Sequence, residues 1–236
     1  MDQYGEPLFA PNGSEEERLF LMDEVFDPMS IAALSGLGVG RRARCLEVGS
    51  GGGSMARWFC SRASEGEVVT TGLGGPLPEE PRSFDVIHAR FEPGQLPVRE
   101  GVMRRMTEWL RPGGFLLVES FSWIPSHGSP NPLYQYVMRR WSDLVLHDKG
   151  RGSGRPGDFP GVRYGLRHPG AESVVRHFQG GGPIAEFWRL TIDLSRERLL
   201  GDGHLTEPEL EQTYGLLRNP RFWDAAPALT QAWGYR

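Results

Sequence analysis

The feature that most constrains the fold is a short apolar run at residues 45–48, which breaks into the glycine-rich residues 49–53 and continues as a helical pattern over about 54–63. A strand that ends in glycines and re-enters a helix opens a strand–helix–strand unit, because glycine allows the tight turn between them. Residues 68–71 are β-branched throughout and favour a second strand. The segment therefore predicts the beginning of a parallel sheet.

Strand and helix patterns continue to alternate up to residue 120. Residues 84–89 and 115–119 read as buried strands, and a helix at 98–110 is closed by the turn sequence RPGG at 111–114. This alternation predicts an α/β fold, Rossmann-like, with a mostly parallel sheet and helices on both faces. We expect strand 45–48 between strands 68–71 and 85–89, with strand 115–119 next to 85–89.

The flanking segments are less regular. Ser14 and Glu17 form a capping box for a first helix, which Asp27 and Pro28 should end while starting a second one. Farther on we expect helices at 133–147, 183–200 and from Thr206 to about 218, and a strand within 172–179. Residues 1–236 are expected to form one domain: a helical segment at 1–36, the core at 37–120, a loop-rich lid at 121–170 and a C-terminal part at 171–236.

Composition excludes several classes of protein. A net charge of −4 argues against a broadly basic nucleic-acid binder, and the two cysteines, Cys45 and Cys60, are too few for a disulfide scaffold or a Cys-rich metal site. Both cysteines should be buried and inert. We expect no metal, no membrane partner and a cytoplasmic location, and an assembly of identical chains is compatible with the sequence.

The glycine loop carries the chemical signal. Glycines let a ligand approach main-chain N–H groups, a pattern that dinucleotide-binding proteins share, and the loop also fits a purely structural turn. Glu47, at the end of the first strand, discriminates between ligands: a carboxylate there repels a pyrophosphate and suits a cation or sugar hydroxyls. This favours S-adenosylmethionine, whose sulfonium and ammonium groups are positive.

Four runs extend the signal, CLEVGSGGGSMARWF, GEVVTTGL, SFDVIHARF and MRRMTEWLRPGGFLLVE, with AEFWRLTID and RFWDAAPALTQAWG near the end. From about residue 15 onward, the chain resembles class I S-adenosylmethionine-dependent methyltransferases of the small-molecule, ubiquinone-biosynthesis-like type. The resemblance implies that the first strand and the loop hold the methionine end of the cofactor. The expected cofactor-binding residues are Glu47, Gly49, Ser50, Gly51, Gly53, His88 and Arg90.

The chain departs from that family at two places. Gly72 stands where the family has an acid that holds the ribose hydroxyls, and only the 12 residues 72–83 precede the next strand, where the family places a further helix and strand. A second shortening is found around residues 163–173. The fold is therefore expected to be truncated at these points.

His88 and Arg90 lie at the end of a predicted strand, on the edge of the sheet where ligands bind in open α/β folds. His88 is the best single candidate for a catalytic group, since an ordinary histidine takes a proton near neutral pH; simple packing is the alternative. Aromatic residues after position 121 could line a substrate pocket or form core: Trp123, Tyr134, Trp141 and Trp188.

The leading hypothesis is methyl transfer from S-adenosylmethionine to a small molecule of secondary metabolism, catalysed mainly by positioning. Two alternatives stay open: a cyclase-type catalyst that does not use the cofactor for methyl transfer, and a non-catalytic binding protein. The intact loop with Glu47 favours the first hypothesis, while Gly72 and the short connection favour the other two.

Overall fold

The computed structural model describes residues 13–49, 51–71, 81–90, 99–148, 164–201 and 203–236. The chain divides into two compact units, each built from three segments. The helical unit contains Met1–Phe26, Ser122–Arg151 and Val174–Ala228, and the sheet unit contains Asp27–Phe121, Gly152–Ser173 and Leu229–Arg236. The expectation of a single domain stays a prediction.

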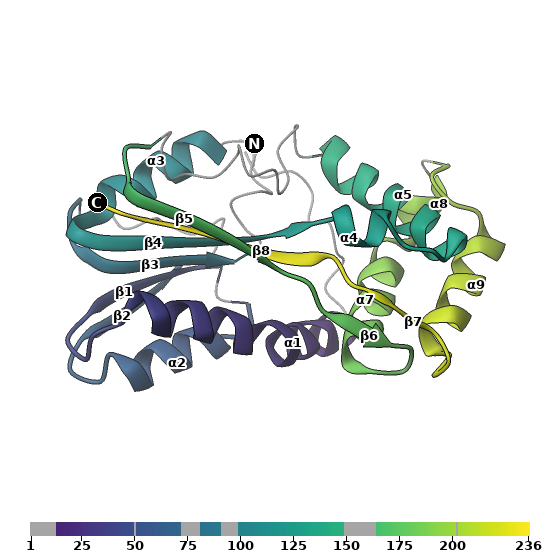
Figure 1. The fold of residues 1–236 in the computed structure, drawn as a ribbon, viewed down its shortest axis with the longest axis horizontal. Helices are drawn as coiled ribbons and strands as arrows, with labels where there is room; N and C mark the ends of the chain where they lie inside the picture. The colour runs from purple at the N-terminus through teal and green to yellow at the C-terminus, as the bar shows by residue number, and fades with distance from the viewer. Residues whose placement is uncertain (1–12, 50, 72–80, 91–98, 149–163, 202) are drawn as a thin grey trace. The chain divides into compact units, whose positions relative to one another are not determined.

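The sheet unit is built on a six-stranded sheet of order β2-β1-β3-β4-β8-β5 (Figure 1). Its strands are β1 Arg44–Val48, β2 Glu67–Thr71, β3 Phe84–Arg90, β4 Leu110–Ser122, β5 Arg167–Val174 and β8 Ala228–Tyr235. The pairs β1–β2, β1–β3 and β3–β4 are parallel, which confirms the predicted order of the first four strands. The end of β8 lies beside the start of β4, because Gly113 N donates to Arg236 O at 2.9 Å, so β8 runs antiparallel to β4.

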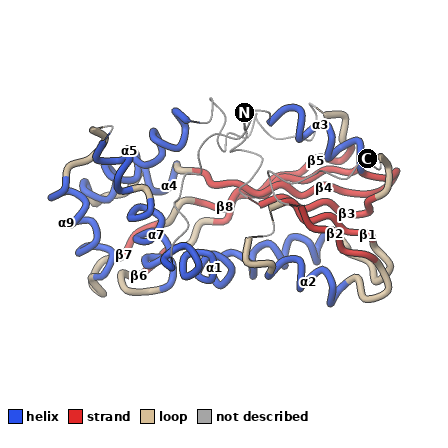
Figure 2. Tube along the Cα trace, turned by 180° about the vertical axis from the view of Figure 1, so that it is seen from behind, coloured by secondary structure: helices blue, strands red, loops and turns tan. Residues whose placement is uncertain are grey.

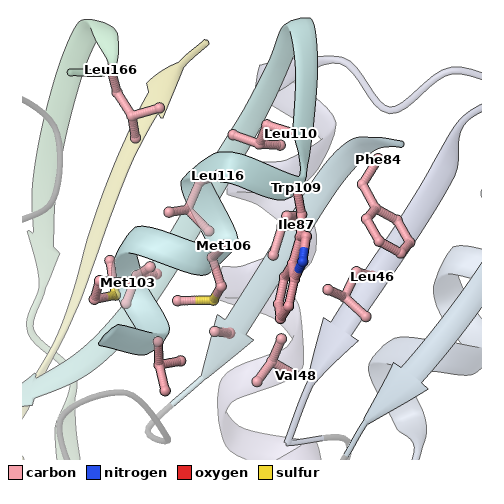
Figure 3. Close-up of a cluster of buried hydrophobic side chains, with 13 residues drawn as sticks. Leu46, Val48, Phe84, Ile87, Met103, Met106, Trp109, Leu110, Leu116 and Leu166 are labelled. Atoms are coloured by element: carbon pink, nitrogen blue, oxygen red, sulfur yellow. The ribbon is translucent and has the colours of Figure 1, made fainter. Parts of the chain in front are cut away.

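Helices cover both faces of this sheet, as the alternation predicted. The second half of α1 (Gly13–Leu37) and α2 (Ser54–Arg62) lie on one face, and α3 (Arg99–Trp109) lies on the other (Figures 1 and 2). Alternate residues of each strand point to opposite sides. Thus Cys45, Val86 and Leu117 pack on the side of α1 and α2. The α3 side forms the cluster of Figure 3, whose largest members include Leu46, Phe84, Ile87, Met106, Trp109, Leu110 and Leu116.

The predicted break at Asp27 and Pro28 is wrong, since α1 continues through Pro28. The Asp27 carboxylate accepts a hydrogen bond from Arg90 at 2.7 Å, so it is engaged by β3 and does not cap a new helix. Burial of Met29 and Leu34 beyond the proline offsets the lost backbone hydrogen bond. The helix begins at Gly13, one residue before the expected cap.

The turn expected at residues 111–114 lies within β4. Phe84 pairs with Leu110 but Val86 pairs with Phe115, so residues 111–114 bulge out opposite a single residue of β3. Gly113 adopts the left-handed conformation with φ of 83°, which supplies the sharp turn of the bulge. The glycines therefore re-aim a strand rather than terminate a helix.

In the described ranges, the helical unit contains the first part of α1, five further helices and a small antiparallel ribbon of β6 (His177–Gln179) and β7 (Trp223–Ala225). The further helices are α4 Ile124–His127, α5 Pro132–Asp148, α7 Pro183–Leu194, α8 Arg196–Gly201 and α9 Glu207–Arg218. The capping box of α9 is confirmed, with Thr206 as N-cap. The strand expected within 172–179 is divided between β5 and β6, and the helix expected at 183–200 is interrupted at Ser195.

The aromatic residues of the helical unit form core. Trp123, Trp141 and Trp188 are buried and pack on one another with ring centroids 5.1–5.8 Å apart. Tyr134 is fully buried and stacks edge-on against Phe178 at 5.8 Å. The structure therefore supports the interpretation of these aromatic residues as core rather than as the lining of a substrate pocket.

The two cysteines differ in environment. Cys45 is buried in β1 as expected, but Cys60 is exposed, because it lies on the face of α2 that points away from the sheet. Among the helices that the structure describes, none combines the length and the apolar character needed to cross a lipid bilayer.

Candidate functional site

The loop between β1 and α2 has the geometry that its glycines predicted. Gly49, Gly51 and Gly53 all have positive φ values, of 78°, 47° and 77°, a conformation that other residues adopt only with strain. Gly49 N donates to Thr71 O at 2.8 Å and ties the start of the loop to the end of β2. Ser50 lies outside the described residues. The loop thus lies at the carboxyl end of β1, the edge where ligands bind in open α/β sheets.

The N-terminus of α2 presents backbone N–H groups that can donate hydrogen bonds. Gly53 is its N-cap and provides no side-chain cap, so the first N–H groups of the helix lack the usual internal acceptor. In the described part of the chain, the buried Ser54 Oγ also has no hydrogen-bond partner. A buried hydroxyl without a partner is unfavourable, and a polar ligand bound here would supply one.

Behind the loop, three ionisable side chains are buried on the α1 and α2 side of the sheet. Glu47 of β1 and His88 of β3 are register partners, and His88 Nδ1 lies 2.6 Å from Glu47 Oε2. His88 Nε2 lies 3.1 Å from Oε2 of Glu119 in β4. His88 and Glu119 are fully buried, and Glu47 is 2% exposed. Both imidazole nitrogens therefore face carboxylates.

Glu119 collects further donors from elements distant in sequence. Ser30 Oγ of α1 donates to Glu119 Oε2 at 2.6 Å, and Gln231 Nε2 of β8 donates to Glu119 Oε1 at 2.5 Å. The same amide nitrogen lies 3.3 Å from Met29 O. A fully buried carboxylate is thereby satisfied by groups from three different elements.

The pKa values follow from these contacts. Burial alone would lower the pKa of His88, but the charges of Glu47 and Glu119 and the hydrogen bonds to both outweigh it and raise that pKa to about 9. Burial would raise the pKa of Glu119, but the hydrogen bonds from His88, Ser30 and Gln231 and the charge of His88 lower it. Burial raises the pKa of Glu47, partly offset by His88. At neutral pH His88 is thus an imidazolium between two carboxyl groups.

Arg90, the last residue of β3, joins the same region. Its Nη1 donates to Asp27 Oδ1 at 2.7 Å and to Ser30 Oγ at 3.3 Å, and its side chain is 6% exposed. Arg90 therefore forms a partly buried ion pair with Asp27 of α1. It also donates to the Ser30 hydroxyl, which itself donates to Glu119.

The structure brings Glu47, His88 and the glycine loop together at the ends of β1 and β3, where the sequence analysis placed them. The general-base role considered for His88 is not the one its surroundings favour, because it already holds a proton on each ring nitrogen at neutral pH. Within the described residues, no group of three histidine, cysteine or acidic side chains is arranged to hold a metal ion.

Sequence reasoning missed Ser30, Ser54, Glu119 and Gln231. For Glu119 a signal existed: an acid at the end of the apolar run 115–118, inside a strand that was expected to be buried, requires a partner. Nothing along the chain identified Ser30 or Gln231 as that partner, since they lie 89 and 112 residues away.

The fold is that of the class I S-adenosylmethionine-dependent methyltransferases. One solved neighbour is the Haemonchus contortus phosphoethanolamine N-methyltransferase 2 bound to phosphomonomethylethanolamine and S-adenosylhomocysteine, with a TM-score of 0.54, 14% identity and coverage of 92% of this chain and 56% of that one. A geranyl diphosphate methyltransferase bound to S-adenosylmethionine has a TM-score of 0.51 and 15% identity, and the match covers 98% and 93% of the two chains. The YcgJ protein of Bacillus subtilis has a TM-score of 0.52 and 15% identity, covering 87% and 97%.

Two curated relatives come from the fungus Strobilurus tenacellus. Methyltransferase str3 is 26% identical over 134 residues, which are 49% of this chain and 48% of the relative. Methyltransferase str2 is 27% identical over 109 residues, 38% of this chain and 40% of the relative. The matched part spans less than half of either relative. No family model matches the chain.

Proposed function

We propose that this chain binds S-adenosylmethionine at the loop between β1 and α2 and transfers its methyl group to a small molecule. The observation that carries the proposal is the loop itself: glycines with positive φ at the carboxyl end of β1, followed by a helix N-terminus whose Ser54 Oγ is buried without a partner in the described residues. These groups fit the charged methionine end of the cofactor, because the N-terminus of a helix attracts a carboxylate.

Each residue has a distinct task in this proposal. Gly49, Gly51 and Gly53 keep the main chain free of side chains where the ligand approaches, and the N–H groups at the start of α2 bind its carboxylate. Ser50, which lies outside the described residues, remains a proposed contact. Glu47 provides the negative charge that suits a cationic ligand, and His88 and Arg90 support that carboxylate and its surroundings from behind.

The bound cofactor supplies an electrophilic methyl group on a sulfonium. Because His88 is protonated at neutral pH, we propose that this chain accelerates transfer by holding the acceptor in line with that group. Proximity and orientation contribute up to about 7–11 kcal/mol in well-aligned reactions. The acceptor we propose is a small metabolite; two of the solved neighbours are named as methyltransferases of phosphoethanolamine and of geranyl diphosphate.

The test is calorimetric titration of the chain with S-adenosylmethionine and S-adenosylhomocysteine, comparing Gly51→Ala with Gly113→Ala. Both glycines have positive φ, of 47° and 83°, so both variants carry comparable backbone strain of about 1–2 kcal/mol. Gly113 lies in the β4 bulge, and a Cβ there meets nothing within 4 Å. We expect Gly51→Ala to weaken binding about tenfold or more and Gly113→Ala to leave it unchanged. Absence of binding by the native chain at millimolar cofactor, or equal affinities of the two variants, contradicts the proposal.

A second candidate is a protein of this fold that has lost methyl transfer. It is favoured by the short connection of residues 72–83 between β2 and β3, and by the position of β2 at the edge of the described sheet. A panel of acceptors assayed with isotope-labelled S-adenosylmethionine separates the two candidates. Saturable cofactor binding without transfer to any acceptor supports the second one.

A further inference from the structure

The buried cluster of Glu47, His88 and Glu119 holds more charged groups than the packing of the sheet requires. Apolar residues of similar volume would fill the same space, and burying ionised groups is costly unless each is paired. Here the contacts run across three adjacent strands, from Glu119 of β4 through His88 of β3 to Glu47 of β1. Glu47 lies two residues before the first glycine of the loop. The arrangement connects Glu119, deep in β4, to the carboxylate that opens the candidate cofactor site.

We propose that Glu119 is a positioning residue for the cofactor site, which holds His88 against Glu47 and thereby fixes the Glu47 carboxylate at the carboxyl end of β1. This inference rests on the proposed function and assigns to that site a residue that does not itself reach the ligand. Glu119 acts through an imidazole, in the way that a carboxylate orients a histidine ligand in other sites.

The hydrogen bonds carry the argument. Oε2 of Glu119 accepts from both Ser30 Oγ and His88 Nε2, and Oε1 accepts from Gln231, so the carboxylate is fixed from three sides. His88 must then carry a proton on Nε2, and its other nitrogen lies at 2.6 Å from Glu47 Oε2. With both nitrogens protonated, the imidazolium donates to two acids and its ring orientation is determined.

The surrounding charges are consistent with this role. Arg90 of β3 and Asp27 of α1 form a neighbouring ion pair, and Arg90 also stabilises the ionised form of Glu47. Among the described residues, the other groups that these contacts place around the imidazole are neutral: Ser30 and Gln231 at Glu119, and the ring of Phe59 from α2, whose centroid is 6.1 Å from that of His88. The proton on His88 is therefore held by the two carboxylates that flank it.

Glu119→Gln is the decisive variant, because it keeps the shape of the side chain and removes its charge. We expect the pKa of His88, followed by imidazole NMR in the full chain, to fall from about 9 by about two units. Affinity for S-adenosylmethionine at pH 8 should fall about tenfold, and recover toward pH 6 as His88 regains its proton. Glu108→Gln, an exposed acid on α3, is the matched control and should change neither quantity.

Three outcomes decide the inference. A native His88 that titrates near pH 6.5 overturns it without any variant, and so does a Glu119→Gln chain with native affinity at pH 8. If Glu119→Gln does not fold, the native chain decides, through the titration of His88 and the amide chemical shifts of Gly49, Gly51 and Gly53 over the same pH range. Amide shifts that change with the protonation of His88 support the coupling. Amide shifts that do not change with it refute the coupling. If the native chain binds no cofactor, the proposed function fails, while the NMR signals still test the connection from Glu119 to the loop.

Discussion

Replacing His88 by glutamine should remove a pH dependence of folding stability whose size follows from the structure. The surroundings of His88 raise its pKa from 6.5 to about 9, and a difference of this size between the folded and unfolded chains corresponds to about 3 kcal/mol. Because the folded-state pKa is the higher one, this stabilisation is fully present below pH 6.5 and is lost as the pH rises through 9. His88 is fully buried, so solvent screening does not reduce the figure.

The variant adds a second cost at neutral pH. Glutamine leaves Glu47 and Glu119 buried without the positive charge between them, and breaking a buried ion pair costs about 3–5 kcal/mol. In the native chain at pH 10 the imidazole is itself neutral. The difference in the free energy of unfolding between the native chain and His88→Gln should therefore be largest near pH 6.5 and shrink by about 3 kcal/mol toward pH 10.

Urea unfolding at several pH values between 6 and 10, followed by circular dichroism, measures this difference. Subtracting the variant from the native chain cancels the contributions of titrating groups that do not contact His88. His177→Gln, at an exposed position of β6, is the control and should leave the pH profile unchanged. Parallel profiles for the native chain and His88→Gln would show that the imidazole carries no stabilising proton, and the reasoning from Glu47 and Glu119 would be refuted.

Two further substitutions test the packing and capping of the two units. Gly66→Ala places a Cβ 2.0 Å from the backbone oxygen of Ala43, so the chain between α2 and β2 must move; we expect a loss of about 1–3 kcal/mol or more in urea unfolding, whereas Gly36→Ala, with open space around it, should lose nothing. Thr206→Ala removes the side-chain half of the capping box, in which Thr206 Oγ1 donates to the Glu209 carboxylate at 2.7 Å, and should destabilise the helical unit by about 0.5–2 kcal/mol in the same assay; an unchanged unfolding midpoint would contradict the assigned cap.

The order of the first four strands could be predicted from the sequence because it depends on local signals. Apolar runs, a glycine loop and helical periodicity each occupy a few adjacent residues, and the right-handed crossover rule then leaves few arrangements. Glu47 belonged to the same signal, since an acid two residues before the first glycine of the loop stands out against the apolar strand.

The features that escaped depend on contacts between distant segments. Pro28 is locally typical of a helix boundary. In the structure, however, Arg90 donates a hydrogen bond to the Asp27 carboxylate, and α1 continues through Pro28 because the residues that follow it are packed in the core. The surroundings of His88 likewise could not be inferred from a lone histidine at the end of a strand, because Glu119 reaches it from 31 residues away. The raised pKa of His88 is thus a property of the assembled sheet.

The order of strands in the sheet also has a consequence for how the chain folds during its synthesis. Among the described strands, β5 pairs in the sheet with β8 alone, and β8 is the last of these strands in chain order and lies between β5 and β4. On the ribosome, β1 to β4 can pair as they emerge, whereas β5 must remain without its partner until β8 has left the exit tunnel. Until then both β5 and the β4 edge expose unpaired backbone groups, which are templates for association with other chains. β5 is polar and mostly exposed in the folded chain, and edge strands of this character are poor templates for such association.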